Sequence, residues 1–214
     1  MTPRAALDRG LGELALALPS GAREQLLEYM ELLAKWNRTY NLTAIRDPLA
    51  MVSHHLLDSL VVLPHLPMPA AEPSLADAGS GAGLPGIPLA VARPEWRVAL
   101  AESSQKKAAF LRQAAIKLGL GNVEVHEGRV EHWRPARRFA VVISRAFAEL
   151  AAFVAACRHL VEPGGVLAAM KGVFPREELA RVPAGCDCSR VIALDTPLLG
   201  AERHLVLCRT DRRT

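Results

Sequence analysis

The chain has 214 residues, which is long enough for one sizeable α/β domain with a small extension and for a core that needs no disulfides. Half of its residues are hydrophobic, yet no stretch of about 18 residues lacks a charge, so we expect no membrane span. The net charge of +4 is a weak indication of a polyanionic partner. The first residues lead into a polar amphipathic stretch and not into a signal peptide, which favours a cytoplasmic protein.

The four cysteines also favour a reducing compartment. They are Cys157, Cys186, Cys188 and Cys208, and none of them forms a Cys-x-x-Cys pair. Cys186 and Cys188 are expected on one face of a strand. We therefore expect incidental reduced thiols and no metal site.

Two helices are expected near the N-terminus. Ser20 is a typical N-cap, and hydrophobic residues follow it at helical spacing to about Trp36. The segment 36–43 is too rich in amide side chains for a helix interior. A second helix is expected to begin with Asp47 as its cap and Pro48 at its first position.

The second helix carries His54 and Asp58 on one face, because they are four residues apart. Two interpretations of this pair stay open, a structural role or contact with a ligand or RNA. A proline-rich linker then runs to Pro73. We expect a helical extension over residues 1–66 and an α/β cofactor-binding domain over 67–214, together forming one compact unit.

From Leu75 onward, short apolar runs alternate with helical patterns. Strands are predicted at 75–79, 97–102, 122–127, 139–144 and 164–171, and helices at 84–93, 104–118, 147–161 and 175–182. This alternation predicts a doubly wound, mostly parallel sheet. Two further β-rich segments, 187–194 and 204–209, have no helix between them and predict an antiparallel hairpin at one edge.

The most informative stretch is Ser74 to Gly86, where an apolar run ends in four clustered glycines and a helical pattern follows. Strand, glycine turn and helix open a nucleotide-binding βαβ unit. The spacing Gly81-x-Gly83-x-x-Gly86, with Glu102 about 20 residues later, also fits the dinucleotide fingerprint.

Two residues of this stretch argue against a pyrophosphate. Asp77 would direct a carboxylate toward the turn, which would repel a phosphate and attract an ammonium group. Pro85 removes one of the N–H groups that a phosphate needs at a helix N-terminus. S-adenosylmethionine satisfies both observations, because it joins an amino-acid head to a nucleoside.

Ligands of open α/β sheets bind beyond the carboxyl ends of the strands, so the residues there are the candidate site. Glu102 is placed to bind the ribose hydroxyls, and the segment Gly128-Arg129-Val130-Glu131 offers backbone groups and an acid that can meet an adenine edge. A basic rim suited to a phosphate backbone is also predicted; its members are Lys106, Lys107, Arg145, Lys171, Arg176 and Arg203. Trp36, Tyr40 and Phe147 could stack an extruded base or simply pack in the core.

These residues together resemble the bacterial 16S ribosomal RNA guanine-N7 methyltransferase family, RsmG, formerly called glucose-inhibited division protein B. The resemblance spans residues 35 to 206. It rests on Lys35-Trp-Asn-Arg-Thr-Tyr-Asn-Leu-Thr, on His54-His-Leu-Leu-Asp-Ser-Leu, on the glycine stretch from Asp77, on Lys106-Lys-Ala-Ala-Phe-Leu-Arg, on Arg129-Val-Glu, on Ile143-Ser-Arg-Ala-Phe, on Lys171-Gly and on Glu202-Arg-His-Leu-Val.

The resemblance implies a class I methyltransferase fold that uses S-adenosylmethionine and modifies one guanine in the 530 loop, in free 16S rRNA or the 30S particle. It implies that Gly79 and Leu84 line the cofactor turn and that Arg145 closes the site over the cofactor. Glu102 stands where many relatives have Asp. Neither a membrane nor an obligate protein partner is expected.

The chemistry of guanine N7 predicts a site without an acid/base pair. N7 carries an in-plane lone pair and no proton, so orientation can supply much of the catalysis. We expect Arg145, Lys171 and Asn41 to act as positioning residues. Three alternatives stay open, namely a methyltransferase for a protein or small molecule, a dinucleotide oxidoreductase, and a catalytically silent RNA-binding protein.

Overall fold

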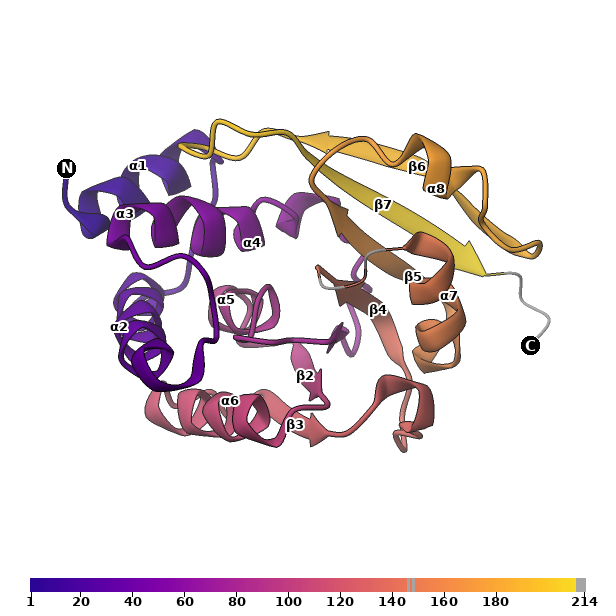
Figure 1. Ribbon diagram of the computed structural model, residues 1–214, viewed down its shortest axis with the longest axis horizontal. Coiled ribbons are helices and arrows are strands. Elements are labelled where there is room, and N and C mark those ends of the chain that lie inside the picture. The colour runs from indigo at the N-terminus through magenta and orange to yellow at the C-terminus, as the bar shows by residue number, and fades with distance from the viewer. Residues whose placement is uncertain (146, 148, 211–214) are drawn as a thin grey trace.

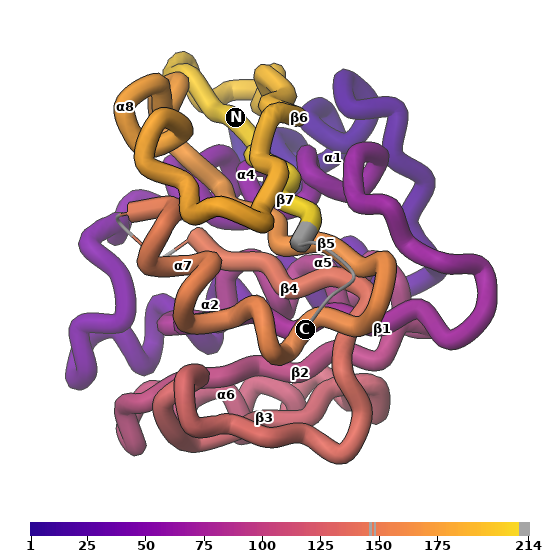
Figure 2. Tube along the Cα trace, turned by 90° about the vertical axis from the view of Figure 1, so that its right-hand side faces the viewer, coloured from indigo at the N-terminus to yellow at the C-terminus, as the bar shows by residue number. Residues whose placement is uncertain are grey.

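The computed structural model describes residues 1–145, 147 and 149–210 as a twisted sheet between two layers of helices (Figure 1). The strands are β1 Ser74–Ala78, β2 Arg97–Glu102, β3 Val123–Glu127, β4 Phe139–Ser144, β5 Val161–Lys171, β6 Cys186–Leu194 and β7 Arg203–Thr210. Their order is β3-β2-β1-β4-β5-β7-β6, which Figure 2 shows from its lower to its upper edge. β1 to β5 are parallel, and β7 is antiparallel to β5 and β6. The predicted sheet and hairpin are confirmed.

The helices are α1 Pro3–Glu13, α2 Ala22–Tyr40, α3 Pro48–Met51, the π-helix η1 Val52–Leu57, α4 Asp58–Leu60, α5 Gly86–Ala92, α6 Gln105–Lys117, α7 Leu150–Cys157 and α8 Arg176–Leu179. Short 3₁₀ turns occupy η2 Leu63–His65, η3 Val130–His132 and η4 Arg158–Leu160. One face of the sheet packs against α5, α6 and the N-terminal helices. The other face packs against α7 and the turns η3 and η4.

The N-terminal helices share a core with the sheet. Leu7 of α1 and Leu26 of α2 belong to the same buried cluster as Leu100 of β2 and Ile143 of β4. Burial of this apolar surface stabilises the α/β layer and the extension together. The division at residues 66 and 67 stays a prediction.

The prediction for segment 36–43 is wrong in its first half, because α2 continues to Tyr40. Trp36 packs edge-on against Phe110, with their ring centroids 5.5 Å apart. The amide of Asn37 is buried, and its Oδ1 accepts a hydrogen bond from Thr43 N at 2.9 Å. These tertiary contacts override the low helix propensity of the segment.

The start of α2 also differs from the prediction, since Gly21, with φ +79°, is the N-cap in place of Ser20. A further helix, α1, precedes it and is capped by the Thr2 side chain. The predicted cap of the next helix is confirmed, because Asp47 Oδ2 accepts from Ala50 N at 2.7 Å. In the described part of the chain, no helix is long and apolar enough to cross a membrane.

The expectation of incidental reduced thiols is wrong for two of the four cysteines. Cys188 and Cys208 form a disulfide between β6 and β7. Cys186 Sγ lies 3.7 Å from Cys188 Sγ, as expected for one strand face. A register shift between Asp187 and Arg190 places Cys188 beside the partner strand. The spacing of the cysteines in the sequence does not by itself predict this cross-strand disulfide.

Candidate active site

The glycine loop lies between β1 and α5, and its backbone needs glycine. Gly79, Gly81 and Gly83 have φ values of +72°, +58° and +89°, which side chains rarely adopt. A Cβ on Gly86 would overlap Leu100 Cδ2 and lie 2.8 Å from Asp77 Oδ2. The loop therefore packs closely onto the ends of β1 and β2.

The N-terminus of α5 has no free donors for a phosphate. Gly86 N donates to Asp77 Oδ2 at 2.9 Å, and Ile87 N donates to Gly83 O at 2.7 Å. Pro85 and Pro88 have no N–H. This geometry argues against the dinucleotide interpretation of the glycine spacing.

Asp77 lies beneath the loop, wholly buried, and its Oδ1 makes no hydrogen bond to any described residue. Burial is the main cause that raises the pKa of this carboxyl to about 7, against the lowering effect of the hydrogen bond from Gly86 and the charge of Arg145. The predicted direct contact between Asp77 and an ammonium group stays untested, since Asp77 does not line the cavity above the loop.

The pKa of Asp77 predicts a pH-dependent stability. The folded pKa of about 7 lies above the ordinary value of 3.8, so folding takes up a proton between these values, and the contribution of Asp77 to stability falls as the pH rises from 4 to 7. Asp77→Asn keeps an acceptor for Gly86 N and cannot ionise. We expect the free energy of unfolding of Asp77→Asn, relative to the parent protein, to rise by a few kcal/mol between pH 4 and pH 8.

Urea denaturation of both proteins at several pH values measures this difference. The free energy of unfolding of the parent protein is subtracted from that of Asp77→Asn at each pH, because His55 adds a pH dependence of its own to both proteins. Burial lowers the pKa of His55 to about 4, so its contribution to the free energy of unfolding rises between pH 4 and 6.5, opposite to that of Asp77. A difference that does not change with pH would contradict the assignment.

Glu102 is nearly buried at the end of β2 and holds the glycine loop. Its Oε2 accepts from Gly81 N at 2.9 Å, and its Oε1 accepts from Ser104 N at 2.8 Å. A carboxylate offers about four lone-pair sites, so each oxygen can still accept a hydrogen bond from a hydroxyl group. Glu102 therefore suits the predicted binding of a ribose.

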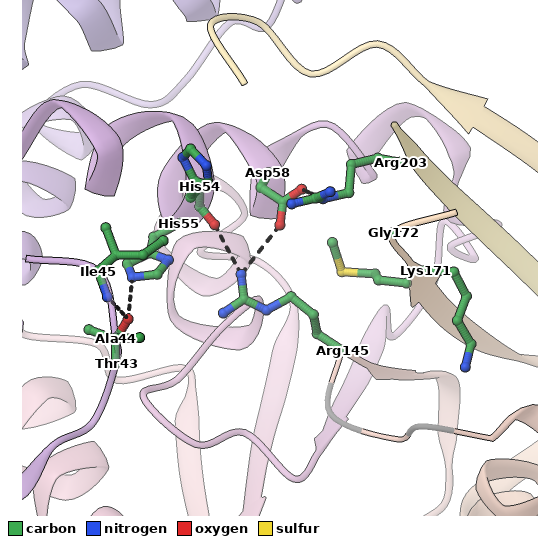
Figure 3. A pocket seen from close by; sticks show the side chains of 11 residues that line it. Thr43, Ala44, Ile45, His54, His55, Asp58, Arg145, Lys171, Gly172 and Arg203 are labelled. Atoms are coloured by element: carbon green, nitrogen blue, oxygen red, sulfur yellow. Dashed lines mark hydrogen bonds and ion pairs between the residues drawn. The ribbon is translucent and has the colours of Figure 1, made fainter. Parts of the chain in front are cut away.

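Two cavities lie beyond the strand ends. The first, the loop cavity, has a volume of about 200 Å³ and is lined by Leu42, Thr43, Gly79, Ser80, Gly81, Ala82, Leu84 and Arg145. The second, the helix cavity, has a volume of about 390 Å³ and is lined by Thr43, Ala44, Ile45, His54, His55, Asp58, Arg145, Met170, Lys171, Gly172 and Arg203 (Figure 3). Thr43 and Arg145 line both, so the two cavities meet at these side chains.

Asp58 holds two arginines at the helix cavity (Figure 3). Its Oδ2 lies 3.3 Å from Arg145 Nη1, and its Oδ1 lies 2.8 Å from Arg203 Nε. Arg145 Nη1 also donates to the carbonyl of His54 at 3.1 Å. The carboxylate is 2% exposed, whereas the arginine side chains are 30% and 22% exposed. We call these three side chains the Asp58 clasp.

Both interpretations of the His54 and Asp58 pair stay open, because Asp58 anchors two arginines, which is a structural role, and both side chains line the helix cavity, where a ligand could contact them. The adjacent His55 orders the loop above, since its Nε2 lies 2.9 Å from Thr43 Oγ1. Desolvation lowers the pKa of His55, so the imidazole is neutral at pH 7.

Two predicted positioning residues are engaged elsewhere. Lys171 lines the helix cavity, but its Nζ donates to Glu178 Oε2 at 2.7 Å and points away from Arg145 (Figure 3). Asn41 is exposed and lines neither cavity, and its Oδ1 accepts from Arg46 at 3.4 Å.

The remaining predicted residues spread along the carboxyl edge of the sheet. Val130 is buried and Glu131 exposed in the turn after β3. Lys106 and Lys107 lie in the first turn of α6, and Arg176 begins α8. The rim is therefore long, and only Arg145, Lys171 and Arg203 of its predicted members line the helix cavity.

The predicted aromatic residues divide between packing and exposure. Phe147 packs against Phe153, with ring centroids 5.4 Å apart, and Trp36 packs against Phe110. Tyr40 remains 42% exposed. Trp36 and Phe147 are half-buried, so both packing and stacking of a base stay open for them.

The strand order, the antiparallel β7 and the glycine loop define the class I S-adenosylmethionine-dependent methyltransferases. Solved structures agree with this fold. The DhpI complex with SAH is 20% identical with a TM-score of 0.56, covering 90% of this chain and 98% of that one. The glycopeptide N-methyltransferase MtfA complexed with S-adenosylmethionine is 14% identical with a TM-score of 0.57, covering 73% and 94%.

Sequence relatives identify the family. The family model described as GidB, rRNA small subunit methyltransferase G, matches residues 22–206. The ribosomal RNA small subunit methyltransferase G of Aromatoleum aromaticum is 54% identical over 207 residues, covering 95% of this chain and 97% of that protein. The protein of the same name from Burkholderia thailandensis is 51% identical over 214 residues, covering 98% and 93%. The chain belongs to the rRNA small subunit methyltransferase G family, as the sequence motifs predicted, and its methyl donor is S-adenosylmethionine.

Proposed function

We propose that this enzyme transfers the methyl group of S-adenosylmethionine to N7 of a guanine in the 530 loop of 16S rRNA. The observation that carries the proposal is the meeting of the loop cavity and the helix cavity at Arg145 and Thr43. A methyl donor in one cavity and a base in the other would share this boundary. Free 16S rRNA or the 30S particle, in the cytoplasm, is the proposed substrate.

The residues around the loop cavity fit the donor. Gly79, Gly81 and Leu84 would hold the amino-acid part, and Glu102 would accept hydrogen bonds from the ribose hydroxyls. Val130 and Glu131, beyond the end of β3, would face the adenine. Asp77 would stabilise the loop through Gly86 N, and the ionised form of its carboxyl would favour a cationic head. When bound, S-adenosylmethionine supplies an electrophilic methyl group.

The helix cavity suits a guanine that needs no general base. N7 is already nucleophilic, and the task of the protein is to hold it in line with the methyl group. The guanidinium groups of Arg145 and Arg203 can donate to guanine oxygen and to phosphate. The Asp58 carboxylate offsets part of their charge, which matters because the base becomes cationic on methylation.

Salt dependence of RNA binding tests the proposed rim. Lys106 and Lys107 form no ion pair with any described carboxylate, and Lys106 is exposed. We expect each substitution by Ala to weaken RNA binding and to reduce the slope of log K against log salt by about one unit, because one phosphate contact is lost.

Lys117 provides the matched control at the other end of α6, where its Nζ pairs with Glu28 at 2.9 Å. Lys117→Ala should leave the slope unchanged. Fluorescence anisotropy with a labelled rRNA fragment over a salt series gives both quantities. If the slope of log K against log salt is the same for all three variants, the N-terminal end of α6 is not part of the RNA interface.

The activity itself is tested with purified protein, labelled S-adenosylmethionine and 30S particles, followed by mapping of the modified base. Label at guanine N7 in the 530 loop supports the proposal. Label at another base, or in protein, overturns it. A family member that methylated only small molecules would show no incorporation into the particles.

A further inference from the structure

The loop between β5 and α8 presents two adjacent hydrophobic side chains to solvent. Val173 is 70% exposed and Phe174 is 47% exposed. Among the described residues, no other two exposed large hydrophobic side chains are neighbours in sequence. Gly172, directly before them, lines the helix cavity. The pair therefore directly follows a residue of the helix cavity, and an exposed apolar surface of this kind indicates a binding partner.

The ring of Phe174 is held in place from one side. It contacts His204 of β7 in a perpendicular arrangement, with ring centroids 5.6 Å apart and planes at 89°. His204 pairs with Lys171 across the β5–β7 ladder, so it is part of the sheet. The Arg176 backbone N donates to Phe174 O at 3.0 Å. An exposed ring supported in this way is preorganised for a flat partner.

The surroundings of the ring are cationic. The Arg176 guanidinium lies 6.0 Å from the centroid of Phe174, and in the described part of the chain it forms no ion pair with a carboxylate. Arg203 precedes His204 in β7, so its side chain points to the opposite face of the sheet, where it lines the helix cavity. An exposed aromatic ring beside a guanidinium group suits single-stranded nucleic acid, because a base can stack on the ring and a phosphate can pair with the arginine.

We propose that Phe174 is a stacking platform for the nucleobase next to the target guanine, with Arg176 binding the phosphate of that nucleotide. This subsite rests on the proposed rRNA substrate. A stacked neighbour would keep the strand at the cavity mouth while the guanine, turned out of its stack, enters beyond Gly172. Phe174 then contributes to RNA binding and does not touch the methyl donor.

Steady-state kinetics with 30S particles tests the platform. We expect Phe174→Ala to raise KM for the particles about tenfold, as the loss of one stacked base implies, and to leave kcat and the affinity for S-adenosylmethionine unchanged. Phe174→Trp should stay near the parent protein, whereas Phe174→Leu should behave like Phe174→Ala, because leucine is apolar but cannot stack. Thermal melting checks that each variant is folded.

Ile116→Ala is the matched control. Ile116 is 76% exposed on α6, which lies far from α8 in both Figure 1 and Figure 2. It should have the KM of the parent protein. If Phe174→Leu retains the parent KM, the contact is apolar packing on another ribosomal component and the stacking proposal fails.

A modified RNA gives the direct readout. Two kinds of particle are reconstituted, one with 16S rRNA that lacks the base before the target guanine and one with 16S rRNA that lacks the base after it. With one of the two, the parent protein should show the rise in KM that Phe174→Ala shows with intact particles. Phe174→Ala should show no further rise there. Additive effects at both sides overturn the platform. If the parent protein does not methylate intact particles, the proposed function itself fails. If it methylates them but the Phe174 variants behave like the parent protein, only the platform fails.

Discussion

Arg145→Ala should lower kcat for rRNA methylation by about 100-fold or more, since loss of one positioning donor at the reacting centre has effects of this size. Arg145 is the charged side chain that borders both cavities, and it is held by Asp58 and by the carbonyl of His54. Arg145→Lys keeps the charge but not the forked geometry, so it should recover only part of the rate. Single-turnover kinetics measures the effect.

The matched control is Arg112→Ala, which removes a half-exposed arginine paired with Glu127 at 2.9 Å on the surface. It should change the rate little. Calorimetric titration with S-adenosylmethionine separates donor binding from turnover. Parent-like donor affinity and turnover in Arg145→Ala would remove Arg145 from the site.

Asp58→Asn should impair both stability and activity, because one buried carboxylate anchors two arginines. We expect a loss of about 1–3 kcal/mol in the free energy of unfolding, less than for a fully buried pair since Arg145 and Arg203 reach solvent. We also expect kcat/KM to fall at least about tenfold, as both guanidinium groups lose their position. Urea denaturation and steady-state kinetics measure the two effects.

A double-mutant cycle shows whether Asp58 acts through Arg203. Adding Arg203→Ala to Asp58→Asn should cost less activity than Arg203→Ala alone costs the parent protein. Asp8→Asn, which breaks an exposed ion pair with Arg23, is the matched acid control. Asp58 would be merely structural if the two single effects on kcat/KM were additive.

The fold was largely predictable because its signals are local. The period of apolar residues predicted every strand of the sheet to within three residues at each end, and the hairpin followed from two β-rich segments without a helix between them. The helix ends were less predictable. Trp36 and Asn37 lie in the helix and are contacted by Phe110 and Thr43, which the local pattern of residues 36–43 does not reveal.

The arrangement around the glycine loop was predictable from strand order. The clustered glycines and Asp77 lie at the end of β1 and Glu102 at the end of β2, and these parallel strands are neighbours in the sheet. Lys171 stays a predicted positioning residue that lines the helix cavity, and its ammonium group pairs with Glu178 of α8. The sequence contains both residues but no signal that they meet.

The sequence by itself determined the class of fold, the glycine loop and the family, since turn chemistry and strand periodicity depend on neighbouring residues. Only the tertiary structure decided the Asp58 clasp and the pairing of Cys188 with Cys208. In the clasp, Asp58 is separated in sequence from Arg145 by 87 positions and from Arg203 by 145 positions. The physical reason is that an ion pair or a disulfide depends on where distant segments pack. That packing follows from the whole buried core, which no single stretch of the chain specifies.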